Sequence, residues 1–174
     1  MAETKIAINR APVLTLWAAV VAERLGFERE EAVSLGKAVA GLTAQSKGRR
    51  LGIYKAAPKE IQEARAKKRG EEFYVDLLGR QIPAVNTEGG VRAISKGTVV
   101  SASAAERYLG SKFGESLEAA RAAMKELAKA HSAEELRAAA FAMYEKFRPA
   151  IPEGVRGWGA KGTLDLAKIR AMAK

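Results

Sequence analysis

The sequence predicts an α+β domain that is mainly helical, and three patterns lead to this expectation. Apolar residues recur at helical spacing over 12–25 and 28–45, and they do so again over 103–147. Between these regions, residues 72–100 show the apolar alternation and the Gly-containing turns of a small antiparallel sheet. A chain of 174 residues with 48% hydrophobic residues is long enough for one domain with a substantial core. We therefore expect a single domain over 1–174, with an N-terminal helix pair, a small sheet and C-terminal helices.

The first helix, over 12–25, is expected to be buried on all sides. Pro12 suits the first turn of a helix, where no backbone N–H is needed. Two stripes of apolar residues at helical spacing cover most of the helix surface. A helix that is apolar nearly all round is typical of a protein core.

The second helix is expected over 28–45. Glu28, Glu30 and Glu31 place negative charge at its positive end, and Gly48 suits a C-terminal cap. Small residues at four-residue spacing form a smooth strip that another backbone can approach closely. This strip consists of Ala32, Gly36 and Ala40.

The sheet is expected to consist of two hairpins. Residues 73–78 show a strand pattern, and Gly79 can turn the chain into an antiparallel partner over 82–85. Pro83 has no N–H to donate to a neighbouring strand, so we expect this partner to be an edge strand. The remaining segments are a loop at 88–90 and a second hairpin from 91–94 and 98–100.

Helices are expected again after the sheet. Two capping-box patterns, Ser103 with Glu106 and Ser132 with Glu135, predict helix starts. Gly114 predicts the end of the first of these helices. The helices predicted in this part cover 103–113, 116–130 and 132–147.

The positive charge of the chain is concentrated in two segments. The formal net charge is +10 and the isoelectric point is near 9.9. Residues 46–70 contain nine Lys or Arg and two Glu, and residues 149–174 contain five basic and two acidic residues. Elsewhere the two signs cancel. This distribution favours a polyanionic partner, and the alternative is a basic protein without one.

The first basic segment, 46–70, is expected to be an arm or loop that contacts phosphates. Its arginines suit the forked hydrogen bonding that phosphate oxygens accept. Two alternatives are a helix end whose cations compensate the helix dipole and a solvated charged linker. The candidate contacts are Lys47, Arg49, Arg50, Lys55, Arg65, Lys67, Lys68 and Arg69.

The second basic segment, 150–174, combines a Gly-rich loop with a short final helix for which Thr163 is the expected N-cap. Arg156 and Lys161 are candidate phosphate contacts in the loop. Trp158 between them is a candidate for stacking on a base or wedging at a groove. The alternative is that Trp158 anchors the tail to the body of the protein.

Several classes of function are excluded or disfavoured. Without Cys, the chain has no disulfides and no thiol chemistry, and with one His, His131, a zinc site is not expected. No nucleophile motif is present. We therefore expect no enzyme activity, no cofactor and no metal. The start of the chain does not resemble a signal peptide, and no apolar run is long enough to cross a bilayer, so we expect a cytoplasmic protein without a membrane partner.

The function predicted from the sequence is non-enzymatic nucleic-acid binding through phosphate contacts. Double-stranded DNA is favoured over RNA because aromatic residues make up only 6% of the chain and no stacking platform is apparent. The main alternative is a protein-interaction or homodimerisation module that uses the apolar first helix and the Ala32, Gly36 and Ala40 strip. An enzyme for an anionic small molecule is a third possibility, but the sequence nominates no general base for it.

Overall fold

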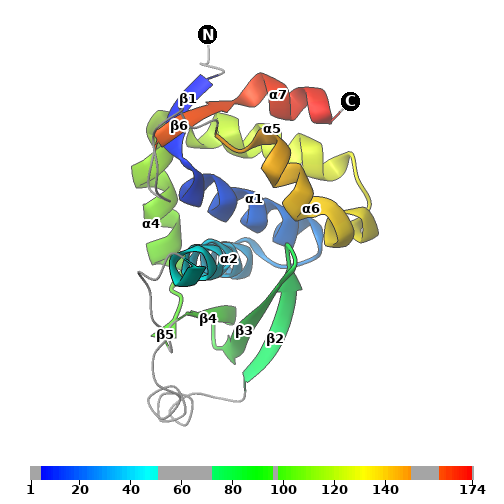
Figure 1. Cartoon of the computed structure of the whole chain (residues 1–174). Helices are drawn as coiled ribbons and strands as arrows, with labels where there is room; N and C mark the ends of the chain where they lie inside the picture. Colours follow the sequence, from blue (N-terminus) through cyan, green and yellow to red (C-terminus); the bar gives the residue numbers. More distant parts are fainter. Residues whose placement is uncertain (1–4, 51–71, 96–97, 150–160, 174) are drawn as a thin grey trace.

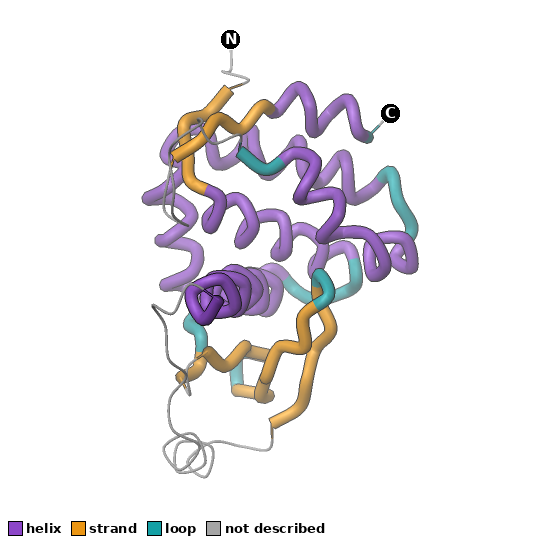
Figure 2. The backbone as a smooth tube through the Cα atoms, viewed as in Figure 1, coloured by secondary structure: helices purple, strands orange, loops and turns teal. Residues whose placement is uncertain are grey.

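A computed structural model of the chain describes residues 5–50, 72–95, 98–149 and 161–173, with residues 42–50 and 161 described by their backbone alone. The fold mixes helices with antiparallel strands and is mainly helical, as the sequence predicts. Figures 1 and 2 show the helices in the middle, with one small group of strands at each end. The helix α1 runs through the centre of this arrangement.

Helix α1, Arg10–Arg24, is the core of the protein. Every residue from Ala11 to Ala22 is buried, which confirms the expectation of a helix without a solvent-exposed face. The indole Nε1 of Trp17 donates to the carbonyl of Ala140 at 2.9 Å, and the ring meets Phe147 edge to face at a centroid distance of 5.4 Å. Although α1 is so apolar, no helix within the described ranges is both long and apolar enough to cross a membrane.

Helix α2, Arg29–Arg50, packs against α1 at very short range. A Cβ atom on Gly36 would lie 2.5 Å from the carbonyl oxygen of Thr15 and 2.9 Å from the backbone nitrogen of Ala19. The predicted strip of small residues is therefore a site of close backbone approach, and its partner is α1 of the same chain. Since both α1 and this strip are buried inside the protein, they do not provide the dimer or partner surface that the interaction-module alternative assigned to them.

The larger sheet is an antiparallel meander of four strands in the order β2-β3-β4-β5. Its strands are β2 Glu72–Leu77, β3 Arg80–Thr87, β4 Gly90–Ser95 and β5 Thr98–Val99. Leu78 and Gly79 join the first two strands with φ values of 51° and 75°, as in a tight hairpin turn with two left-handed residues. The expectation that Pro83 lies in an edge strand is wrong, because β3 is paired on both sides. Pro83 is tolerated because β4 pairs only with the part of β3 from Ala84 onward.

The smaller sheet joins two segments from opposite ends of the described chain. Strand β1, Lys5–Asn9, pairs antiparallel with β6, Lys161–Asp165, so that Asn9 lies opposite Lys161. This strand pair was not expected from the sequence. Because Thr163 lies within β6, it is a strand residue, and the expectation that it caps the final helix is wrong. Asp165 instead caps α7, Leu166–Met172, by accepting from the backbone N–H of Ala167 at 3.0 Å.

The remaining helices surround α1. They are α4 Ala102–Phe113, the short 3-10 helix η1 Gly114–Ser116, α5 Leu117–Lys129 and α6 Ala133–Phe147. The capping box at Ser132 and Glu135 is confirmed by both of its hydrogen bonds. The expected box at Ser103 is wrong: Ser101 caps α4 by accepting from Ala104 at 3.2 Å, and Glu106 faces two arginines instead.

We expect Gly36→Ala to destabilise the protein by about 1–3 kcal/mol, because the new methyl group would push against backbone atoms that cannot move aside. Gly110→Ala is a matched control: Gly110 is an exposed residue within α4, and nothing lies within 4 Å of the position of its Cβ. The control should gain up to about 1 kcal/mol from the better helix propensity of Ala. Urea unfolding of the two variants measures both effects. If Gly36→Ala were as stable as the parent, the close packing of α1 on α2 would be wrong.

Candidate nucleic-acid interface

Helix α2 carries the first group of predicted contacts, Lys47, Arg49 and Arg50, on its last turn. The prediction that this helix ends before Gly48 is wrong, since the helix continues through Gly48 to Arg50. One Gly inside a helix costs only about 1 kcal/mol, and the neighbouring Lys and Arg are good helix formers. With 22 residues, α2 is about 33 Å long, so its basic end is well separated from its beginning.

The sheet holds the other half of α2 through the part of β4 that β5 does not pair with. The hydroxyl of Ser34, a fully buried residue, accepts from the backbone N–H of Ala93 at 2.9 Å and donates to the carbonyl of Val100 at 2.8 Å. Side chains of a helix thus satisfy backbone groups that a further strand would otherwise bind. This contact fixes the helix against the sheet on one side while α1 fixes it on the other.

Glu31 makes a second contact of the same kind. Its carboxylate accepts from the backbone N–H groups of Val91 and Glu28, each at 2.9 Å. These two donors, the one on Val91 first, hold the pKa of Glu31 below its ordinary value, and the nearby charge of Arg92 acts in the same direction. The ionised form of Glu31 therefore stabilises the junction between α2 and β4.

Several arginines of the helical body are neutralised by carboxylates. Glu106 accepts from Arg29 at 3.3 Å and from Arg121 at 3.2 Å, which ties α2 to α4 and α5. The Arg121 side chain is only 5% exposed, and its second terminal nitrogen lies 3.8 Å from Glu118. At the sheet, Arg92 donates to Glu30 at 3.1 Å. These cations have partners within the fold and are poor candidates for binding an external anion.

The structure places the predicted contacts on two separate elements. Lys47, Arg49 and Arg50 have helical backbone at the end of α2, while Lys161 is the first residue of β6. In Figure 1, β6 lies with β1 at one end of the molecule, and α2 lies beside the larger sheet. The other predicted contacts fall outside the described residues. They are Lys55, Arg65, Lys67, Lys68, Arg69, Arg156 and Trp158.

The contacts of His131 hold the start of α6 and the end of α1 together. Its Nδ1 lies 3.0 Å from the carboxylate of Glu135, and its backbone carbonyl accepts from Arg24 at 3.1 Å. The hydrogen bond from His131, followed by those from Ser132, holds the pKa of Glu135 below its ordinary value. Within the described ranges, no group of three or more His, Cys, Asp or Glu residues could hold a metal ion.

Two arginines that the sequence analysis did not select meet where α6 ends. The Nε of Arg10 donates to the carbonyl of Pro149 at 3.1 Å, so Arg10 is bonded to the residue that directly follows Arg148. Burial, followed by the charge of Arg148, lowers the pKa of Arg10. One feature of the sequence could have pointed to Arg10. It is the first residue of an apolar helix whose first turn contains no acidic residue to balance its charge.

Comparison of the chain with protein-family models, with curated proteins and with solved structures finds no significant match. The functional argument therefore rests on the residues themselves.

We expect Glu31→Gln to lower the stability at neutral pH by about 0.5–1 kcal/mol, since a partly exposed amide accepts these hydrogen bonds less well than a carboxylate. The folded-state pKa of Glu31 is lowered, so its contribution is complete above the ordinary value of 4.5 and is lost as the pH falls through the folded pKa. The difference between parent and variant should consequently shrink below about pH 4.5. Urea titrations between pH 7 and pH 3 measure this, with Glu126→Gln, an exposed residue of α5, as the control. A difference that stays constant down to pH 3 would contradict the assignment.

Proposed function

We propose that this chain is a non-enzymatic nucleic-acid-binding protein that holds duplex DNA through its phosphate backbone. The observation that carries the proposal is the distribution of charge. The whole excess of +10 falls in residues 46–70 and 149–174, whereas the rest of the chain has equal numbers of acidic and basic residues. A polyanion would be attracted to these two segments and not to the body between them.

The anchoring of α2 supports the proposal. Its first half is fixed by close packing on α1 at Gly36 and by the hydrogen bonds of Ser34 and Glu31 to the sheet. The turn with Lys47, Arg49 and Arg50 therefore extends from a rigid support. Binding groups on rigid elements lose less conformational entropy when they meet a ligand.

The ion pairs outside the two basic segments also support the proposal of nucleic-acid binding. Arg29, Arg92 and Arg121 are bound to glutamates that belong to other helices or strands. A phosphate that approached these arginines would have to displace a carboxylate. The two basic segments contain more Lys and Arg than acidic residues, and such segments favour binding that is sensitive to salt and indifferent to base sequence.

We expect Arg49→Glu with Arg50→Glu to weaken binding to duplexes of any sequence. If all seven excess charges of residues 46–70 engage phosphates, the slope of log K against log salt approaches about −6, and loss of two contacts reduces it by about 2. Fluorescence anisotropy with a labelled duplex at several salt concentrations gives both quantities. Single-stranded DNA, RNA and heparin serve as competitors and test the preference for duplex DNA.

The control is Lys125→Glu with Arg137→Glu, which makes the same change in net charge at exposed positions of α5 and α6. This control should bind duplex DNA nearly as well as the parent. Equal losses in the two double variants would mean that only the net charge matters. Unchanged affinity in the Arg49 and Arg50 variant would refute the assigned interface.

A further inference from the structure

Arg10 is held at a junction between three segments. It is the first residue of α1 and directly follows β1. Its Nε donates to the carbonyl of Pro149 at 3.1 Å, and its own carbonyl accepts from the hydroxyl of Tyr144 at 3.4 Å. Tyr144 is itself buried and packs edge to face on Phe147. Both the side chain and the backbone of Arg10 are thus fixed to the end of α6.

This junction also receives the two ends of the segment 150–160. The described chain leaves α6 through Arg148 and Pro149 and returns at Lys161, whose Cα is paired with that of Asn9. The backbone positions of Arg10 and Lys161 are therefore close, because Asn9 and Arg10 are consecutive. Through strand register and one hydrogen bond, the fold gathers cationic residues that are distant in the sequence.

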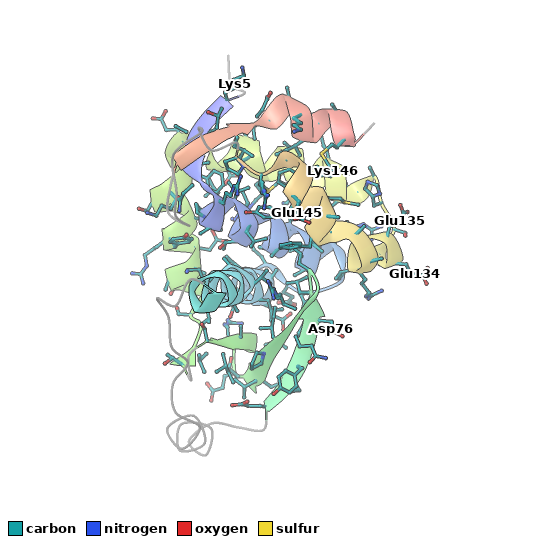
Figure 3. All side chains as sticks on the ribbon, viewed as in Figure 1. Lys5, Asp76, Glu134, Glu135, Glu145 and Lys146 are labelled. Atoms are coloured by element: carbon teal, nitrogen blue, oxygen red, sulfur yellow. The ribbon has the colours of Figure 1, made fainter. Side chains whose placement is uncertain are left out.

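Among the described residues, the two arginines at this junction lack the ion pairs that other arginines of the fold form. Neither Arg10 nor Arg148 forms an ion pair with a carboxylate of the described chain, in contrast to Arg29, Arg92 and Arg121. Figure 3 shows Glu134 and Glu135 at the beginning of α6, the end remote from this junction.

Glu145 is the acidic residue nearest to Arg148 in the sequence, and it is exposed and pairs with neither arginine. The start of α1 adds to the excess of positive charge. Arg10 places a cation at the positive end of the helix dipole, and the cap residue Asn9 makes no side-chain hydrogen bond to the free N–H groups there. Arg10 and Arg148 are both partly buried residues without an ion-pair partner in the described chain, and a bound anion would offset their charge.

We propose that Arg10 and Arg148 form a phosphate-binding pair where the second basic segment meets the body of the protein. Arginine suits this role because its planar fork matches two oxygens of one phosphate group. The phosphate belongs either to a nucleic-acid backbone, in which case the pair extends the proposed interface and rests on the proposed function, or to free phosphate. The chemistry of recognition is the same for both sources.

The first experiment is a nuclear magnetic resonance titration with inorganic phosphate at constant ionic strength, observing the arginine Nε–H signals. We expect saturable shifts at Arg10 and Arg148. Arg148→Gln should weaken the apparent affinity at Arg10 at least about fivefold. The side chain of Arg148 makes no hydrogen bond within the described chain, so this variant should fold normally. The control is Arg137→Gln, another α6 arginine that is exposed, and it should titrate like the parent. Absence of saturable shifts, or equal titrations in the two variants, would overturn the proposal.

The second experiment separates the two sources of phosphate. If the pair holds a nucleic-acid backbone, Arg148→Gln should bind a duplex about 3–10-fold more weakly, with a salt slope smaller by about 1. Saturable phosphate binding together with normal duplex binding by Arg148→Gln would assign the pair to free phosphate. Duplex binding that depends on Arg49 and Arg50, without any phosphate response at Arg10, would leave the proposed function intact and overturn only the pair.

Discussion

The burial of α1 on every side is the constraint on which most of the structure depends. An apolar helix without a polar face must be covered by other elements on its entire circumference, because each exposed apolar side chain would lose about 1.5–3 kcal/mol of burial energy. Here α2 approaches at Gly36, α6 supplies Phe147 and a carbonyl for Trp17, and α4 and α5 lie around the same helix. The larger sheet does not need to cover α1 directly, since it is attached through the side chains of α2.

The treatment of charge follows from this packing. Helices that converge on one core bring their surface cations close to glutamates of their neighbours, as Glu106 does for Arg29 and Arg121. Arginines that are paired with glutamates in this way create little electrostatic field outside the protein. The excess positive charge is left to the two basic segments, the first of which begins in the last turns of α2, and the proposed attraction of a polyanion would act over about a Debye length from them.

Local patterns in the sequence were sufficient for much of the fold. The buried first helix, the two hairpins within the larger sheet and the capping box at Ser132 depend on residues close together in the chain, whereas the pairing of β3 with β4 was not predicted. The wrong predictions concern residues whose structure depends on contacts with residues far away in the sequence. Ser101 caps α4 in place of Ser103, and Glu106 is bound by Arg29 and Arg121 from other helices. Pro83 is tolerated inside the sheet because β4 pairs with β3 only from Ala84 onward.

The same distinction holds for the candidate site. Counting charges located the two basic segments, and no contact information was needed for that step. Arg10 and Arg148 were not selected because they lie in stretches whose charges cancel, and the link between Arg10 and the end of α6 is a long-range contact to Pro149. Ser34 is a similar case: a small polar residue on an apolar face acquires its role from the edge of β4.

The pairing of β1 with β6 has a consequence for how the chain is made. Translation produces Lys5–Asn9 before Lys161–Asp165, so a growing polypeptide carries β1 without its partner until β6 has been made. Directly behind β1 comes α1, the most apolar helix, which also waits for α6 to cover Trp17. A nascent chain that has not yet reached α6 thus exposes this apolar helix, a state in which chaperones bind and aggregation competes with folding.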